Sequence, residues 1–114
     1  MEIKPNPLQN YLLAALPGEV QQRMFHHLEL VSLPLGKVVY ESGDTVRHVF
    51  FPSNSIVSLL YVLESGASAE ISVVGNEGLV GIAMFMGGES TPSRAIVQSA
   101  GHAYKMAGQS LKDE

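Results

Sequence analysis

The first 29 residues contain two segments in which apolar side chains recur at helical spacing. In the first segment Asn6 is a natural N-cap and Pro7 occupies the first helical position. The second segment begins at Pro17. We therefore predict two short N-terminal helices within residues 1–29 that form a lid on the rest of the chain. Their apolar positions are Leu8, Leu12, Leu13, Val20, Met24 and Leu28.

From Leu30 onward the pattern changes to short runs of β-branched and aromatic residues, which are separated by Gly, Asn, Asp and Ser. Such runs predict strands joined by tight turns, and many short strands of this kind are typical of a sandwich, a jelly roll or a small barrel. The predicted strands cover residues 30–33, 38–40, 47–51, 55–63, 69–74, 95–99 and 102–106.

The composition indicates one domain with a real core, since 46% of the 114 residues are hydrophobic and 16% are charged. The absence of cysteine excludes a thiolate zinc site and a thiol switch, and it fits a reducing cytoplasm. The longest apolar run, residues 56–63, is far shorter than the roughly 20 residues that span a bilayer. We expect a soluble, cytoplasmic protein with no membrane partner.

The formal net charge is −4, and the seven basic residues are scattered along the chain. A surface that binds duplex nucleic acid needs clustered positive charge to displace counterions. We therefore expect no direct nucleic-acid binding by this chain. The basic residues are Lys4, Arg23, Lys37, Arg47, Arg94, Lys105 and Lys112.

One segment interrupts the strand rhythm and could carry chemistry. In residues 77–88 glycines bracket a short apolar stretch that we expect to form a turn of helix, and Arg94 follows after a polar loop. Glycines let the backbone approach a ligand, a helix N-terminus attracts anions, and an arginine can complete a phosphate site. The residues leave an alternative open, a glycine-rich loop that only packs a short helix across the end of the sheet.

Six stretches, taken together, resemble the sensor domain of the Crp/Fnr-type transcriptional regulators over nearly the whole chain. They are LLAALP (12–17), LGKVVYESGD (35–44), HVFFP (48–52), SAEI (68–71), VGNEGLVG (74–81) and VQSAG (97–101). The resemblance implies a mainly β fold with short flanking helices, a jelly-roll β-roll of the cyclic-nucleotide-binding-domain type (a double-stranded β-helix).

It also implies an organisation for residues 1–114 as a single sensor domain. The β-roll would occupy residues 30–106 with a phosphate-binding cassette at 77–95, and residues 107–114 would start a truncated C-terminal helix. Family members continue into a long dimerisation helix and a DNA-binding helix-turn-helix. Neither is in this sequence, so we expect either a truncated or a naturally short sensor. A homodimer would normally form through the missing helix.

Family members that bind cyclic nucleotides use a Gly-Glu-Leu run, whose glutamate holds the ribose, and an Arg-Ser/Thr-Ala run, whose arginine pairs with the cyclic phosphate. Here the first run reads Glu77-Gly78-Leu79 and the second reads Ser93-Arg94-Ala95, so a serine stands where the arginine is expected. Strand residues alternate between faces, so this slip of one residue turns Arg94 away unless a bulge near Pro92 turns it back.

The resemblance nevertheless implies a set of ligand-binding residues in this segment. Glu77 would take a sugar or an amine, the cassette amides would take an anion, and Arg94 would compensate charge. The full set is Glu77, Gly78, Leu79, Gly81, Ser93, Arg94 and Ala95. The candidate ligand is a cyclic nucleotide, cAMP or cGMP, although the departures argue equally for another small anionic ligand or for none. No cofactor beyond this is implied.

Two alternatives stay open beside a regulatory ligand sensor. One is a degenerate structural or protein-interaction β-roll without a small ligand. The other is a cupin-like metal-binding domain, but that site needs a His-x-His pair, which the four histidines at 26, 27, 48 and 102 do not provide. We predict no enzyme and no catalytic residues, because neither a Gly-x-Ser-x-Gly elbow nor a Ser-His-Asp pattern is present.

Overall fold

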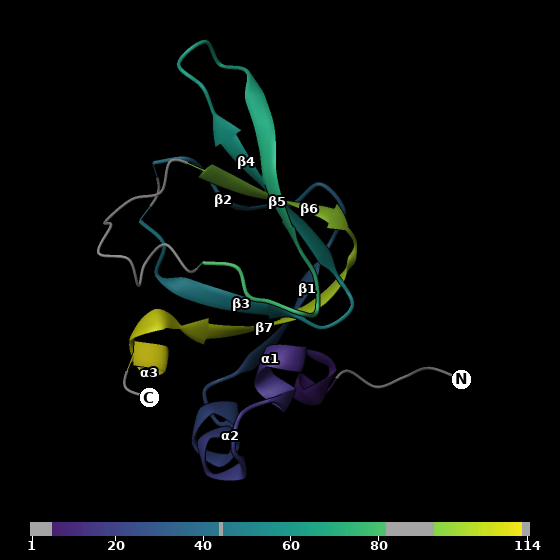
Figure 1. The fold of residues 1–114 in the computed structure, drawn as a ribbon, viewed down its shortest axis with the longest axis vertical. Coiled ribbons are helices and arrows are strands. Elements are labelled where there is room, and N and C mark those ends of the chain that lie inside the picture. The colour runs from purple at the N-terminus through teal and green to yellow at the C-terminus, as the bar shows by residue number, and fades with distance from the viewer. Residues whose placement is uncertain (1–5, 44, 82–92, 113–114) are drawn as a thin grey trace.

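A computed structural model describes residues 6–43, 45–81 and 93–112 of the 114-residue chain. Two antiparallel sheets dominate it (Figure 1). The three-stranded sheet has the order β1 (Glu29–Leu33), β7 (Gly101–Ala107) and β3 (His48–Pro52). The four-stranded sheet has the order β2 (Val38–Tyr40), β6 (Ser93–Ser99), β4 (Ile56–Val62) and β5 (Ser68–Val74). All seven predicted strands are confirmed, and so is the mainly β fold class.

The N-terminal helices differ from the prediction in one respect. Asn6 caps a 3₁₀ turn, η1 (Pro7–Gln9), as expected, but the helix does not continue through Leu13. The Asn10 side chain accepts hydrogen bonds from two following backbone N–H groups and starts a new helix, α1 (Tyr11–Ala14). The second predicted helix, α2 (Gly18–Phe25), begins directly after Pro17, and a short helix α3 (Gly108–Lys112) follows β7.

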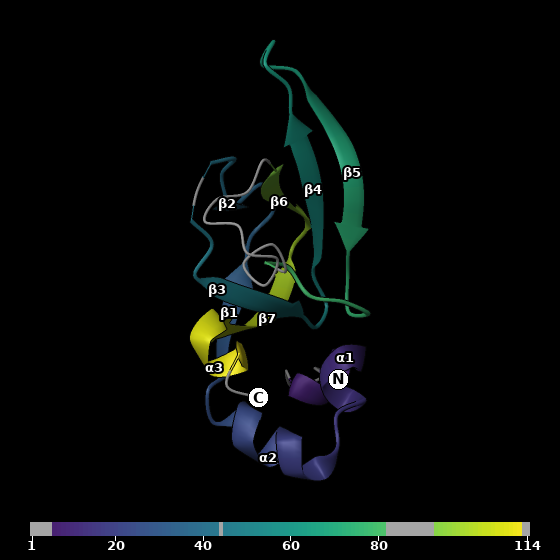
Figure 2. The same ribbon diagram turned by 60° about the vertical axis from the view of Figure 1, so that its left-hand side comes forward.

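Apolar side chains form two clusters, one on each face of the three-stranded sheet. Between the two sheets lie Leu33, Val57, Val74, Val80, Ala95, Val97 and Ala103. Between that sheet and the helices lie Leu13, Met24, Val49, Phe51, Tyr104 and Met106. The alternation of strand side chains produces this division, because Val49 and Phe51 face the helices while Phe50 faces the roll. Figure 2 shows the helices gathered beneath β3 and β7, far from the tip of the β4–β5 hairpin.

Buried polar contacts hold one end of the roll, where β3 finishes. The Asn10 amide is fully buried and donates to the carbonyl oxygens of Pro52, at 2.9 Å, and Gly78, at 2.8 Å. Nearby, the side chain of Asn54 accepts from the His102 N–H at 2.6 Å. A Cβ atom on Gly101 would lie 2.6 Å from the Asn54 carbonyl oxygen, so only glycine fits there. We call this region the anchored end.

Candidate functional site

The start of the predicted cassette is fixed to strand β3. Phe50 and Val80 exchange two backbone hydrogen bonds, at 2.9 and 2.8 Å. Gly81 follows with a φ of 110°, and a Cβ atom there would lie 2.7 Å from the carbonyl oxygen of His48. A glycine is therefore required at position 81 for backbone conformation and for close approach. The predicted turn of helix beyond it falls in residues 82–92, outside the described residues.

The first run of predicted ligand residues points in several directions. The Glu77 carboxylate is exposed and accepts a hydrogen bond from the Gly75 N–H at 3.0 Å, and this bond is the main cause that lowers its pKa. The carbonyl of Gly78 is occupied by Asn10. Leu79 packs against the cluster between the three-stranded sheet and the helices. None of these three residues borders the roll cavity described below.

The second run alternates across β6. Ser93 and Ala95 are buried on the inner face, opposite Tyr61 and Leu59 of β4. Arg94 lies between them on the other face, and its guanidinium forms an ion pair with Glu41 at 2.8 Å. The side chain of Arg94 is 29% exposed, so this pair is partly screened by solvent. In this structure Arg94 compensates the charge of Glu41 on the outside of the roll.

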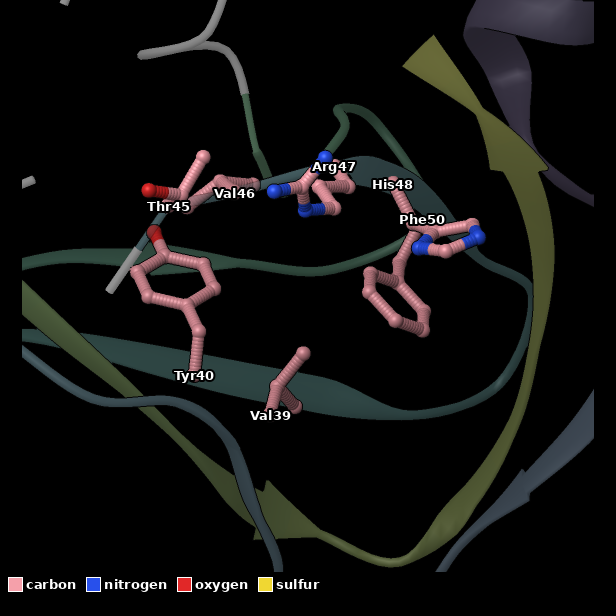
Figure 3. A pocket seen from close by; sticks show the side chains of 7 residues that line it. All are labelled: Val39, Tyr40, Thr45, Val46, Arg47, His48 and Phe50. Atoms are coloured by element: carbon pink, nitrogen blue, oxygen red, sulfur yellow. The ribbon is translucent and has the colours of Figure 1, made fainter. Parts of the chain in front are cut away.

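The inner face of the roll contains a cavity of about 220 Å³ (Figure 3). It lies between β2 and the segment that leads into β3, and its rim is open because Thr45, Arg47 and His48 are exposed. The Tyr40 hydroxyl is hydrogen-bonded to Ser93, and burial raises the pKa of this phenol despite that bond. The described residues that line the cavity are Val39, Tyr40, Thr45, Val46, Arg47, His48 and Phe50.

One main-chain contact connects the cavity to the C-terminal helix. The Gly108 N–H, at the first residue of α3, donates to the carbonyl oxygen of Arg47 at 2.9 Å. The same residue therefore contributes its side chain to the cavity and its backbone to the start of α3. A displacement of the Arg47 backbone would therefore stretch or break the hydrogen bond at the start of α3.

Sequence reasoning did not select these cavity residues. Arg47 is one of seven scattered basic residues, and His48 enters only the test for a metal site and the HVFFP stretch of the family resemblance. The signal that could have found them was strand alternation, which places His48 and Phe50 on the same face of β3, opposite the face that packs on the helices. Within the described ranges, no three His, Asp or Glu side chains cluster in a way that could hold a metal ion.

Comparison with known proteins identifies the family. A sequence model of the cyclic nucleotide-binding domain matches residues 30–114. The chain belongs to the cyclic nucleotide-binding domain family. No curated protein sequence matches it significantly. None of the described helices of this domain is long and apolar enough to cross a membrane.

Solved structures of related folds agree with this assignment. The N-terminal domain of a transcriptional regulator from Streptomyces coelicolor A3(2) superposes with a TM-score of 0.76 at 19% identity, covering 96% of this chain and 79% of that one. The sensor domain of the regulator DNR from Pseudomonas aeruginosa gives 0.78 at 15% identity, covering 93% and 71%. The jelly-roll β-roll and the resemblance to Crp/Fnr-type sensor domains are confirmed.

A third similar structure comes from a different class of protein. It is the regulatory subunit of a cAMP-independent protein kinase A from Trypanosoma cruzi bound to guanosine, with a TM-score of 0.78 at 12% identity. The match covers 89% of this chain but only 37% of that one. The same fold therefore occurs in bacterial regulators and in kinase regulatory subunits.

Proposed function

We propose that this cyclic nucleotide-binding domain is a regulatory, non-catalytic sensor that takes a small anionic or nucleotide ligand in the cavity beside Tyr40 and Arg47. The observation that carries the proposal is the double role of Arg47, whose side chain lines the cavity and whose carbonyl holds Gly108 of α3. A ligand that prefers one position of this segment would shift the population of α3 positions. This shift is the regulatory output.

The proposed ligand would lie in the cavity, on the side that faces the inner surface of β6. Ser93 is hydrogen-bonded to Tyr40, Ala95 lies opposite Tyr40 in the sheet, and Gly81 packs against His48. Each of these three predicted site residues therefore neighbours a residue that lines the cavity. The predicted anion-binding role of the cassette amides requires the Gly78 and Val80 N–H groups to leave their present partners, the carbonyl oxygens of Gly75 and Phe50. The proposed ligand roles of Glu77, Leu79 and Arg94 require each to leave its present contacts.

Cyclic AMP and cyclic GMP are the first ligands to test, and guanosine is the third because a structure of the same fold is bound to it. A ligand at a hundred times its Kd should stabilise the fold by about 2.7 kcal/mol, which a thermal melt detects. Binding should also change hydrogen exchange at the Gly108 amide. If none of the three compounds at millimolar concentration changes the melt or the exchange, the sensor proposal fails for nucleotide ligands.

A second candidate is a ligand-free structural or protein-interaction β-roll. Two observations favour it, the Arg94–Glu41 ion pair and the hydrogen bond from Gly75 to Glu77, because both put charged groups of the predicted site into internal contacts. This candidate predicts no ligand-induced change in the melt.

We further propose that residues 1–114 fold as one sensor domain that works in the cytoplasm. The homodimer that the resemblance to Crp/Fnr-type regulators implies would normally form through a C-terminal helix that is not in this sequence. The scattered basic residues support a chain that does not itself bind nucleic acid. Sedimentation equilibrium, with and without cyclic GMP, measures the oligomeric state directly.

A further inference from the structure

Basic side chains gather around the inner cavity of the roll. A second cavity of about 160 Å³ adjoins the first and shares Val39 and Phe50 with it. Lys37 and Lys105 line the second cavity, while Arg47 lines the first. Strand pairing between β3 and β7 brings the two sets together, because Phe50 lies opposite Lys105. Three cationic side chains from separate segments therefore line the two adjoining cavities of the roll.

The acidic residues described nearby do not neutralise Arg47. Glu29 pairs with Lys105 at 3.5 Å, and Glu41 pairs with Arg94 at 2.8 Å. No ion pair or hydrogen bond joins the Arg47 guanidinium to another residue of the described chain. Asp44 precedes Thr45 in sequence and lies outside the described residues. Arg47 thus borders the cavity with its hydrogen-bonding capacity available.

We infer that Arg47 is the residue that pairs with the anionic group of the ligand, in the role that the sequence pattern assigned to Arg94. This inference rests on the proposed function and names the ligand class, a compact anion with a flat apolar portion. Arg47 supplies the charge, Thr45 and Tyr40 supply hydroxyl groups, and Phe50 supplies an apolar wall. In the view of Figure 3 the Arg47 side chain lies between Thr45 and His48, along the rim.

Two further observations fit this assignment. A tyrosine phenol is protonated at neutral pH, and burial raises the pKa of Tyr40 further, so its hydroxyl can act as a donor. The cavity volume of about 220 Å³ is smaller than the roughly 300–1,000 Å³ of sites for drug-sized ligands, which favours a compact ligand or the phosphate end of a nucleotide. Free phosphate and a nucleotide phosphate share this chemistry, and the experiment separates them.

The test is calorimetric titration of the whole chain with inorganic phosphate, guanosine and cyclic GMP. Three variants remove one positive charge each. Arg47→Gln tests the inference, Arg94→Gln tests the cassette arginine, and Arg23→Gln on α2 is the matched charge control far from the cavity. Arg47→Lys is included because it keeps the charge. Thermal melts of all four variants check that each is folded.

We expect the wild type to bind cyclic GMP more tightly than guanosine. Arg47→Gln should weaken cyclic GMP by about tenfold, since a charged hydrogen bond at a partly exposed site is lost, and should leave guanosine within about twofold. Arg47→Lys should recover part of the loss, Arg23→Gln should change nothing, and 1 M salt should reduce the wild-type preference. Phosphate binding that Arg47→Gln removes would support an anion subsite that serves free phosphate as well.

Other outcomes overturn the inference. Equal affinity of the wild type for guanosine and cyclic GMP, or a loss at Arg94→Gln instead of Arg47→Gln, would reject Arg47 as the anion partner while the sensor proposal stands. If the wild type binds none of the three probes and does not bind cyclic AMP either, the sensor proposal for nucleotide ligands and the inference fail together.

Discussion

The two ends of the β-roll satisfy their polar groups in different ways. At the anchored end, on the right in Figure 1, the Asn10 amide is buried and pairs with the carbonyls of Pro52 and Gly78. At the opposite end, Thr45 and Arg47 are exposed beside a cavity. A buried polar group must find its partner within the protein, whereas an exposed one is free to bind something else. Stability should therefore depend on the anchored end and ligand binding on the open end.

The largest expected effect is that of Asn10→Ala. The substitution removes a helix cap, worth about 1 kcal/mol, and leaves two largely buried carbonyls without their donor, at roughly 1–3 kcal/mol each. We expect a loss of about 3–7 kcal/mol in the free energy of unfolding, measured by urea denaturation. Asn6→Ala is the matched control, because Asn6 caps η1 at an exposed position. Equal losses for the two variants would contradict the contrast between the ends.

At the open end, Tyr40→Phe should cost about 1 kcal/mol, because it removes one hydrogen bond to Ser93 and keeps the ring. The pKa of Tyr40 is raised in the folded state, so its contribution to stability is full below pH 10 and decreases as pH rises through the folded pKa. The variant should lose less stability than wild type above pH 10. Urea denaturation at pH 7 and pH 10.5 measures both effects.

Tyr11→Phe is the control for this substitution, since Tyr11 is 62% exposed. It should leave the free energy of unfolding unchanged within error at pH 7. A cost for Tyr40→Phe as large as that for Asn10→Ala would mean that the cavity end is also structurally essential. That result would contradict the division between an end that stabilises the fold and an end that binds a ligand.

The strands and the Asn6 cap could be predicted because their signals are local. Alternation of β-branched residues identifies a strand, and an Asn-Pro pair identifies a helix start. The break at Asn10 could not be predicted, because its two carbonyl partners lie 42 and 68 residues away in sequence. Local pattern shows that an asparagine can cap a helix, but not that this one is buried between two distant turns.

The cavity was missed for a related reason. A bulge in β2 places both Val38 and Tyr40 opposite neighbouring residues of β6, Ile96 and Ala95, so that Tyr40 faces inward. The sequence pattern cannot locate such a register shift. Without knowledge of the shift, the hydrogen bond between Tyr40 and Ser93 cannot be predicted. Between Ser93 and Ala95 the register of β6 against β4 is regular, and simple alternation indicates that Arg94 turns away from Ser93 and Ala95, as the structure shows.

The smallest expected effect is that of Glu77→Gln. It tests whether burial, or position in the fold, decides how much a polar group contributes to stability. Glu77 belongs to the anchored end, but its carboxylate is exposed, and its hydrogen bond to the Gly75 N–H lowers its pKa. Its contribution to stability is therefore present above pH 4.5 and is lost as pH falls through the folded pKa. Glu77→Gln should destabilise less than Tyr40→Phe at pH 7, and the difference from wild type should shrink as pH is lowered from 4.5 toward 2, as measured by urea denaturation across this range.

If Glu77→Gln instead lowers the free energy of unfolding as much as Asn10→Ala, the whole turn from Gly75 to Gly78 contributes strongly to stability, whether its polar groups are buried or exposed. A small cost, set against the large one at Asn10, would show that an anchored end is defined by the burial of its polar groups. On that basis Arg47, exposed at the other end, is a residue that folding leaves available for a ligand.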